Sequence, residues 1–251
     1  MDSFLSEAYL NMLATDLDGT LVGDDRACDE LLEYLNMNYH RFGLTYITGR
    51  HFNSVMQLIA ETALPRPDIL VTDVGTVIHV LDRNSEKRSD AYSIDETWQK
   101  LMQKDWQPEN IDEIGKQIAG LTRQQLPDNC RVSYYADSSL TANKFEDALV
   151  SANIKHTFVF SSGRDIDILP ADGGKGQALR YIVRHYCQPQ ARILAAGDSG
   201  NDREMILSGF PAVIVGNARP ELASIEESQL IYKATGKYAA GILEGWHHFY
   251  G

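Results

Sequence analysis

The chain has 251 residues, of which 43% are hydrophobic, and its formal net charge at pH 7 is −12. This length is enough for one large domain or two modest ones with a real core. The acidic balance, with no run of lysine or arginine, argues against nucleic acid or a membrane as partner, because such surfaces need a basic stripe. An anionic small molecule stays open, since a few local cations and a metal set the potential inside a cleft.

The three cysteines, Cys28, Cys130 and Cys187, are odd in number and far apart. They lack the spacing of a zinc site and the even count of a disulfide framework, so we expect reduced thiols. The acidic N-terminus does not resemble a targeting segment, and no stretch approaches the ~20 apolar residues of a membrane span. These features predict a cytoplasmic protein.

The first third of the chain alternates strands and helices. An apolar strand ends at Asp16, a helical pattern follows through Leu35, and a second strand covers 44–47. A second helix through 52–59 leads to a third strand at 69–72. This order predicts an α/β fold with right-handed crossovers, namely a Rossmann-like three-layer core around a parallel sheet.

The pattern changes near Val80, where a charged stretch over 82–90 interrupts the alternation. Helices are expected at 98–104, 111–121 and 140–152, and strands at 132–135, 157–160 and 166–169. We therefore expect an inserted α+β cap domain over 80–170, hinged near Ile78 and Pro170. The core would comprise 1–79 and 171–251, because a helix from Lys175, strands at 193–196 and 212–215, a short helix at 205–207 and a final helix at 242–249 resume the first pattern.

Polar loops occur at four places in the expected core: Asp16-Leu17-Asp18-Gly19-Thr20, Thr48-Gly49-Arg50, Gly174-Lys175-Gly176 and Gly197-Asp198-Ser199-Gly200-Asn201-Asp202. Three of them follow strand ends, which on an open sheet meet at one edge where ligands bind. Carboxylates from Asp16, Asp198 and Asp202 are hard oxygen ligands that suit Mg²⁺. Thr48, Lys175 and the glycines could hold a phosphoryl group, so the set predicts phosphoryl transfer.

With these motifs in this order, the sequence resembles the haloacid dehalogenase-like hydrolases. The resemblance implies that Asp16 is the nucleophile and Asp18 the general acid/base. It also implies a Mg²⁺ site and a phosphate site, and it makes the insert similar to that family's second type of cap, an α/β lid for substrate specificity. The expected metal-site residues are Asp16, Asp18, Asp198 and Asp202, and the expected phosphate-binding residues are Thr48, Gly49, Lys175 and Asn201.

Within that superfamily, the sequence is most similar to the sucrose-phosphatase group, through Tyr46–Arg50, Val74–Thr76, Phe160–Pro170 and Ser199. The resemblance implies a disaccharide phosphate as substrate, and sucrose 6-phosphate is the first candidate. That group often has Lys where Arg164 stands, and a branch acting on mannosylfructose phosphate shares Leu64–Asp68, so that sugar is the alternative. We expect a monomer, with a sugar-phosphate synthase as a possible partner. The expected sugar-binding residues are Arg50, Arg164, Asp165 and Asp167.

Two other classes fit part of the pattern. A phosphoacceptor signalling domain also uses an aspartate at a strand end, Mg²⁺, a threonine and a lysine, but it needs no second carboxylate at Asp18 and no ~90-residue insert. A non-catalytic sugar-phosphate-binding module would bind without releasing phosphate. We interpret four aromatic residues of the insert as packing residues: Trp98, Trp106, Tyr134 and Tyr135.

Overall fold

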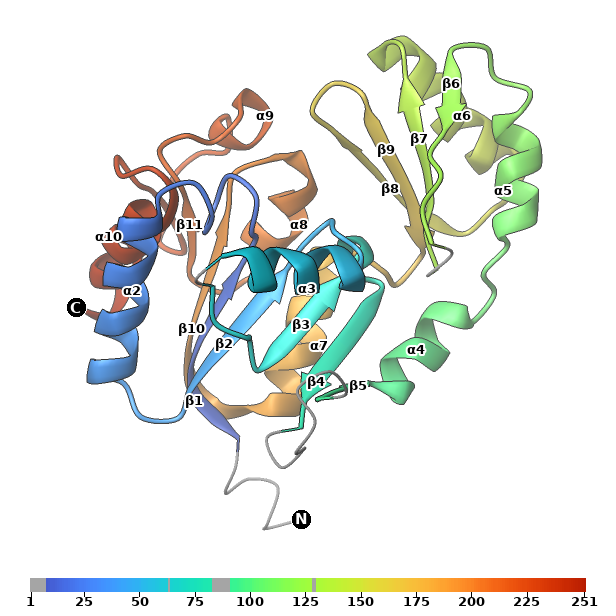
Figure 1. Ribbon diagram of the computed structural model, residues 1–251. Helices are drawn as coiled ribbons and strands as arrows, with labels where there is room; N and C mark the ends of the chain where they lie inside the picture. The colour runs from blue at the N-terminus through green and yellow to red at the C-terminus, as the bar shows by residue number, and fades with distance from the viewer. Residues whose placement is uncertain (1–7, 63, 83–90, 128–129) are drawn as a thin grey trace.

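The computed structural model describes residues 8–62, 64–82, 91–127 and 130–251. Figure 1 shows a large body of helices around a sheet and a smaller body that stands beside it. No helix within the described residues is both long enough and apolar enough to cross a membrane. The charged stretch expected at 82–90 lies, apart from Asp82, outside the described residues.

An eight-stranded sheet forms the larger body, in the order β12-β11-β10-β1-β2-β3-β4-β5. Six of these strands are mutually parallel: β1 (Tyr9–Thr15), β2 (Phe42–Ile47), β3 (Ile69–Thr72), β10 (Cys187–Gly197), β11 (Ala212–Ile214) and β12 (Ile231–Lys233). β4 (Val77–Leu81) and β5 (Tyr92–Ile94) continue the sheet in antiparallel fashion. The predicted α/β class is confirmed, and the parallel strands dominate the sheet.

Helices cover both faces of this sheet and make three layers. One face packs against α2 (Asp25–Asn38), α3 (Phe52–Glu61) and α10 (Tyr238–Tyr250), with Trp246 of α10 completely buried. The other packs against α4 (Glu96–Gln103), α7 (Lys175–Tyr186), α8 (Arg203–Ile206) and the short α9 (Pro220–Ala223). Alternate residues of β1 enter the two cores, because successive side chains on a strand point to opposite faces.

The topology places four polar loops in a row. β10, β1, β2 and β3 are consecutive neighbours in the sheet and are parallel, so their carboxyl ends lie at one edge. The residues that follow these ends are Asp198, Asp16, Thr48 and Asp73, in that spatial order. The first three were predicted from the sequence, and Asp73 was not.

The smaller body is an antiparallel sheet of four strands, in the order β6-β7-β9-β8. Its strands are β6 (Leu121–Arg123), β7 (Val132–Ala136), β8 (His156–Ser161) and β9 (Asp165–Pro170). Two helices, α5 (Pro108–Gly115) and α6 (Ser139–Ser151), cover one face and share a separate core with it, centred on the fully buried Phe145. In Figure 1 the hairpin of β8 and β9 is the part of this body nearest to the larger one.

The expected start of the insert near residue 80 needs correction. β5 pairs with β4 in the large sheet, and Trp98 and Met102 of α4 are buried in the large core. The charged stretch over 82–90 had suggested a departure from the core, because it interrupts the alternation of strands and helices. The described residues up to Gln103 therefore belong with the core, and the smaller body begins after α4. The helix expected over 111–121 is α5, and it ends at Gly115.

Candidate active site

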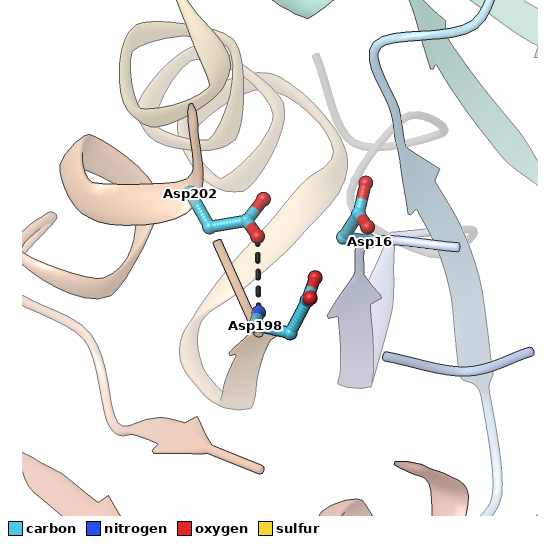
Figure 2. Close-up of side chains that lie close together, drawn as sticks. All are labelled: Asp16, Asp198 and Asp202. Atoms are coloured by element: carbon cyan, nitrogen blue, oxygen red, sulfur yellow. Dashed lines mark hydrogen bonds between the residues drawn. The ribbon is translucent and has the colours of Figure 1, made fainter. Parts of the chain in front are cut away.

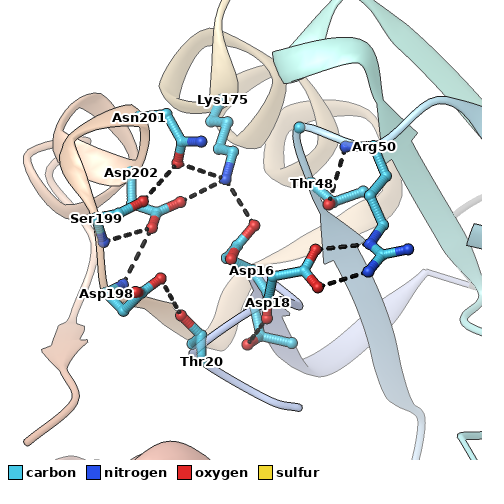
Figure 3. Close-up of polar contacts among 12 residues, drawn as sticks. Asp16, Asp18, Thr20, Thr48, Arg50, Lys175, Asp198, Ser199, Asn201 and Asp202 are labelled. Carbon is cyan, nitrogen blue, oxygen red and sulfur yellow. Dashed lines mark hydrogen bonds and ion pairs between the residues drawn. The ribbon is translucent and has the colours of Figure 1, made fainter. Parts of the chain in front are cut away.

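Three elements bring a buried lysine against two buried carboxylates. Lys175, the first residue of α7, directs its Nζ to Asp16 Oδ1 at 2.7 Å and to Asp202 Oδ1 at 2.6 Å. The same Nζ donates to Asn201 Oδ1 at 2.9 Å. The side chain of Lys175 is fully buried, so these three acceptors replace its hydration. Figure 3 shows the lysine between the end of β1 and the loop after β10.

Asp202 organises the loop after β10. Its Oδ2 accepts the backbone N–H groups of Asp198 and Ser199 at 3.0 and 3.1 Å, while its Oδ1 accepts from Lys175. These bonds close a capping box at the start of the short helical turn 200–202 (Figure 3). Asp202 thus fixes the backbone that carries Asp198, and both of its oxygens already have donors.

The carboxylates of Asp16, Asp198 and Asp202 offer oxygen atoms that lie within 4.8 Å of one another. Figure 2 shows the three side chains around one space. Asp198 Oδ1 accepts from Thr20 Oγ1 at 3.1 Å. Gly19 allows this approach, because it has φ +85° and a methyl group built on it would lie 2.7 Å from Asp198 Oδ2.

Burial raises the pKa of two of these acids. The pKa of Asp16 rises to about 8, chiefly through burial, with Lys175 opposing the rise and Asp202 adding to it. The pKa of Asp198 rises to about 6, again chiefly through burial and then through Asp202. For Lys175, burial alone would lower the pKa, but the charges of Asp16 and Asp202 raise it well above its usual value. The single positive charge of Lys175 does not balance three carboxylates, so the site favours binding of a second cation.

The donor set fits Mg²⁺. All candidate ligand atoms are carboxylate oxygens, which this hard cation prefers. Among the described contacts, none uses Oδ2 of Asp16 or Oδ2 of Asp198, whereas both oxygens of Asp202 accept hydrogen bonds. Asp16 and Asp198 are therefore the better placed ligands, with Asp202 supporting them through the loop.

Asp18 lies outside this cluster. Its carboxylate takes both prongs of the Arg50 guanidinium, at 2.6 Å from Nε and 2.7 Å from Nη2 (Figure 3). Arg50 also donates to Ser54 Oγ at 3.0 Å. The Asp18 side chain remains half exposed, so this ion pair is open to solvent, unlike the buried cluster around Lys175. The structure thus joins Asp18, predicted both as the acid/base and as a metal-site residue, to Arg50, which was predicted to bind sugar, and the acidic cluster comprises the other three predicted metal-site residues.

The predicted phosphate-binding residues come from the loops after β2 and β10 and from the start of α7. Thr48 follows β2 and is buried; its Oγ1 accepts the backbone N–H of Arg50 at 3.2 Å. A methyl group built on Gly49 would lie 3.7 Å from Asn201 Nδ2, so the loop after β2 and the loop after β10 approach each other here. Lys175 completes the set from behind Asn201.

The loop after β3 adjoins the site, although its residues had supported only the family resemblance and no site role was predicted for them. Asp73 N donates to Arg50 O at 2.9 Å and Val74 N donates to Thr48 O at 3.1 Å. Asp73, Val74 and Gly75 all have positive φ, and a methyl group built on Gly75 would lie 2.3 Å from the carbonyl carbon of Gly174. This turn is wedged between the Thr48 loop and the start of α7. Its position after a third apolar strand was the available signal.

Three of the four residues predicted to bind sugar, Arg164, Asp165 and Asp167, lie on the smaller body, hereafter the cap, whereas Arg50 lies in the core. Ile166 and Ile168 of β9 enter the cap core, so Asp165 and Asp167, which alternate with them, point to the opposite face. Arg164 stacks on the ring of Tyr135, with its guanidinium carbon 4.1 Å from the ring centroid. Tyr135 therefore differs from the packing role expected for it.

The other three aromatic residues for which packing was predicted pack as expected. Tyr134 is buried in the cap core, and Trp106 packs against it half-buried. Trp98 is buried in the larger core.

A helix-covered parallel sheet with an aspartate after β1, a threonine after β2, a lysine opening α7 and an acidic loop after β10 defines a haloacid dehalogenase-like hydrolase with a cap. The family described as sucrose-6F-phosphate phosphohydrolase matches residues 9–250, and the chain belongs to this family. It is accordingly a phosphoric monoester hydrolase.

Three relatives illustrate the likeness. A mannosylfructose-phosphate phosphatase from Agrobacterium fabrum is 33% identical over 96% of this chain and 97% of its own length. Sucrose-phosphatase 1 from Nicotiana tabacum is 29% identical over 99% of this chain and 61% of its own length. The crystal structure of the sucrose-phosphatase from Synechocystis, in complex with sucrose and phosphate, superimposes with a TM-score of 0.85 at 31% identity, over 96% of this chain and 98% of that one.

Proposed function

We propose that the protein removes the phosphoryl group from a disaccharide phosphate, with sucrose 6-phosphate as the first candidate substrate. The observation that carries the proposal is the Asp16 carboxylate, which lies at the end of β1 and is held by the buried Lys175 at 2.7 Å. It is supported by the relatives named for sucrose and mannosylfructose phosphates, the second of which keeps mannosylfructose phosphate as the alternative.

The chemistry that we propose has two steps. A carboxylate oxygen of Asp16 attacks phosphorus, the bond from phosphorus to the sugar oxygen breaks, and Asp18 gives its proton to that oxygen. Water then attacks the aspartyl phosphate, Asp18 takes a proton from it, and inorganic phosphate leaves Asp16 as a carboxylate. Arg50 orients Asp18 through its two-pronged contact.

Mg²⁺ is the cofactor that we propose. Held by Asp16 and Asp198, it would supply positive charge beside the phosphoryl oxygens. Lys175, the hydroxyl of Thr48 and the amide of Asn201 would contact the same oxygens from the protein side, and Gly49 lets the backbone approach closely.

The domain organisation that we propose assigns the sugar to the cap. The cap comprises the residues between α4 and Pro170, and its open face presents Arg164, Asp165 and Tyr135. Charged side chains and aromatic faces are the groups that recognise sugars through hydrogen bonds and stacking. Bringing that face over the pocket would exclude water from the reaction.

The setting that we propose is the cytoplasm, where the free thiols of Cys28, Cys130 and Cys187 would persist. We propose that the chain acts as a monomer and leave a synthase as its candidate protein partner. Size-exclusion chromatography with light scattering, alone and with a sugar-phosphate synthase, checks both statements.

Phosphate release from a panel of sugar phosphates tests the function. With Mg²⁺ present, sucrose 6-phosphate should be hydrolysed with a kcat/KM at least tenfold above those of glucose 6-phosphate and trehalose 6-phosphate. A higher kcat/KM for mannosylfructose phosphate than for sucrose 6-phosphate would identify mannosylfructose phosphate as the substrate. Stable phosphorylation of Asp16 without turnover would support the signalling domain instead, and binding without release would support the non-catalytic module.

A further inference from the structure

Arg131 extends from the cap into the core beneath the phosphate-binding loop. It lies directly before β7, and its side chain is only 4% exposed. Its Nη1 donates to the backbone oxygen of Gly49 at 2.8 Å, and its Nη2 lies 3.1 Å from Asp73 Oδ1. Gly49 and Asp73 both belong to the core, in the loops after β2 and β3. A buried arginine thus crosses the boundary between the two bodies.

The same guanidinium also faces the sugar side of the cap. Nη1 lies 3.8 Å from Asp167 Oδ1, and that oxygen accepts the hydroxyl of Ser133 at 2.5 Å. Ser133 and Asp167 are paired residues on β7 and β9. Burial raises the pKa of Asp167, and Arg131 opposes the rise. Asp73, with its side chain fully buried, stands on the other side of the guanidinium. One cation is therefore shared between a carboxylate of the cap and a carboxylate of the core.

The contact with Gly49 bears on the phosphate-binding loop because a peptide unit is planar. The Gly49 carbonyl and the Arg50 N–H belong to one plane and point in opposite directions. While Arg131 holds the carbonyl, the N–H points to Thr48 Oγ1, to which it donates at 3.2 Å. Arg50 follows immediately and clamps Asp18. The position of the cap is thereby linked to the orientation of the loop that carries Thr48 and Arg50.

A second contact at the other end of the cap shows that the two bodies meet around the pocket. In the turn between β8 and β9, Ser162 N donates to Glu221 Oε1 of α9 at 3.4 Å. A methyl group built on Gly200 would lie 3.3 Å from Phe160 O. These groups are on the surface, whereas the Arg131 contacts are buried, and buried charge-assisted bonds are the stronger ones.

We propose that Arg131 is a positioning residue that transmits closure of the cap to the phosphate-binding loop, so that a substrate whose sugar closes the cap is hydrolysed faster than one without a sugar. This inference rests on the proposed function. Arg131 acts through Gly49 and Asp73 and touches neither the phosphoryl group nor, through its described contacts, the predicted nucleophile. Asp167 is a predicted sugar contact, and it also lies beside the Arg131 guanidinium. Binding of the sugar to Asp167 would therefore change how firmly Arg131 is held.

The test compares Arg131→Gln with Arg123→Gln on two substrates. Arg123 is a matched control: it is a partly buried arginine of the cap, and its bonds to Asp112, Gln124 and Ser133 stay within the cap. Arg131→Gln should lower kcat for sucrose 6-phosphate at least tenfold and change kcat for p-nitrophenyl phosphate less than twofold. Arg123→Gln should change neither by more than twofold. For Arg131→Lys, kcat for sucrose 6-phosphate should lie between those of the wild type and Arg131→Gln. An ammonium keeps the charge but lacks the planar guanidinium that reaches both Gly49 and Asp73.

Small-angle X-ray scattering gives a readout independent of turnover. The radius of gyration of Arg131→Gln should exceed that of the wild type and of Arg123→Gln, without ligand and with Mg²⁺, sucrose and inorganic phosphate. Equal losses on both substrates, no loss on either, or identical scattering would each overturn the proposal. If the wild type released no phosphate from any sugar phosphate, the proposed function itself would fail, whereas a failure of the Arg131 proposal alone would leave wild-type hydrolysis of sucrose 6-phosphate intact.

Discussion

The catalytic pocket of the core and the open face of the cap differ in how deeply their polar side chains are buried. In the pocket, Asp16, Asp202 and Lys175 are buried, and Lys175 bonds both carboxylates at 2.6 to 2.7 Å. On the cap, Arg164 lies on Tyr135, and Asp165 precedes the buried Ile166 on the opposite, partly exposed face. A buried, prearranged cluster stabilises charge with little rearrangement, whereas an open polar face has to desolvate with each substrate. Changes in the pocket should therefore cost more than changes on the cap.

The largest effect is expected at the end of β1. Asp16→Asn removes the proposed nucleophile, and kcat should fall by at least ~10³ on every phosphate ester. Asp18→Asn should also lose turnover yet still bind Mg²⁺, because Asp18 stands outside the acidic cluster. Phosphate release and Mg²⁺ titration by calorimetry measure the two quantities. A beryllium fluoride adduct found remote from Asp16 would contradict covalent catalysis.

The next effect concerns stability. Lys175→Met leaves Asp16 and Asp202 buried without their shared cation, and breaking such a pair costs ~3–5 kcal/mol. Chemical denaturation without Mg²⁺ should show this fall in the free energy of unfolding. Arg180→Met, on the same helix with a half-exposed side chain, serves as the control and should cost much less. An unfolding free energy within ~1 kcal/mol of the wild type would show that the cluster is not held by Lys175.

The metal site comes third. Asp198→Ala removes one of the two better placed ligands, so the Mg²⁺ concentration for half-maximal activity should rise by about a hundredfold, with activity partly recovered at high Mg²⁺. A chelator should abolish wild-type activity, and zinc should not substitute well. Full activity in metal-free buffer would refute the proposed cofactor.

The smallest effect is expected on the cap. Arg164→Ala should lower kcat/KM for the disaccharide phosphate by about tenfold, the ~1.4 kcal/mol typical of a lost charged hydrogen bond, and leave an aryl phosphate unchanged. Lys144→Ala, on the outer helix α6, is the matched control and should change neither substrate. A loss on both substrates would mean that Arg164 supports the cap fold rather than the sugar.

The same contrast explains what the sequence could predict. Asp16, Thr48 and Asp198 each follow an apolar strand directly, so local pattern and topology were enough to bring them together. The link between Arg131 and Gly49 joins residues 82 positions apart, and nothing local to either residue signals it. The bidentate contact of Asp18 with Arg50, which is 32 residues away, is likewise signalled by nothing local to either residue.

The misplaced start of the insert has a similar cause. Alternation of apolar residues predicts a strand but does not say which sheet it joins. β5 has only three residues, Tyr92–Ile94, and its membership of the large sheet depends on pairing with β4 across a charged segment. Register and partner choice are tertiary properties, so the boundary could come only from the structure.

The two chain crossings into the cap lie side by side. Lys104 and Trp106 on the way out, and Pro170 and Asp172 on the way back, line one pocket of ~130 Å³. The cap segment therefore leaves and re-enters the core at neighbouring points, so it can be exchanged for the cap of a relative without rethreading the sheet that carries Asp16. Such an exchange has to keep the buried contacts of Arg131 with Gly49 and Asp73, which join the cap to the core. If the cap selects the sugar, as we propose, substrate preference can then be changed apart from the residues that cleave the bond.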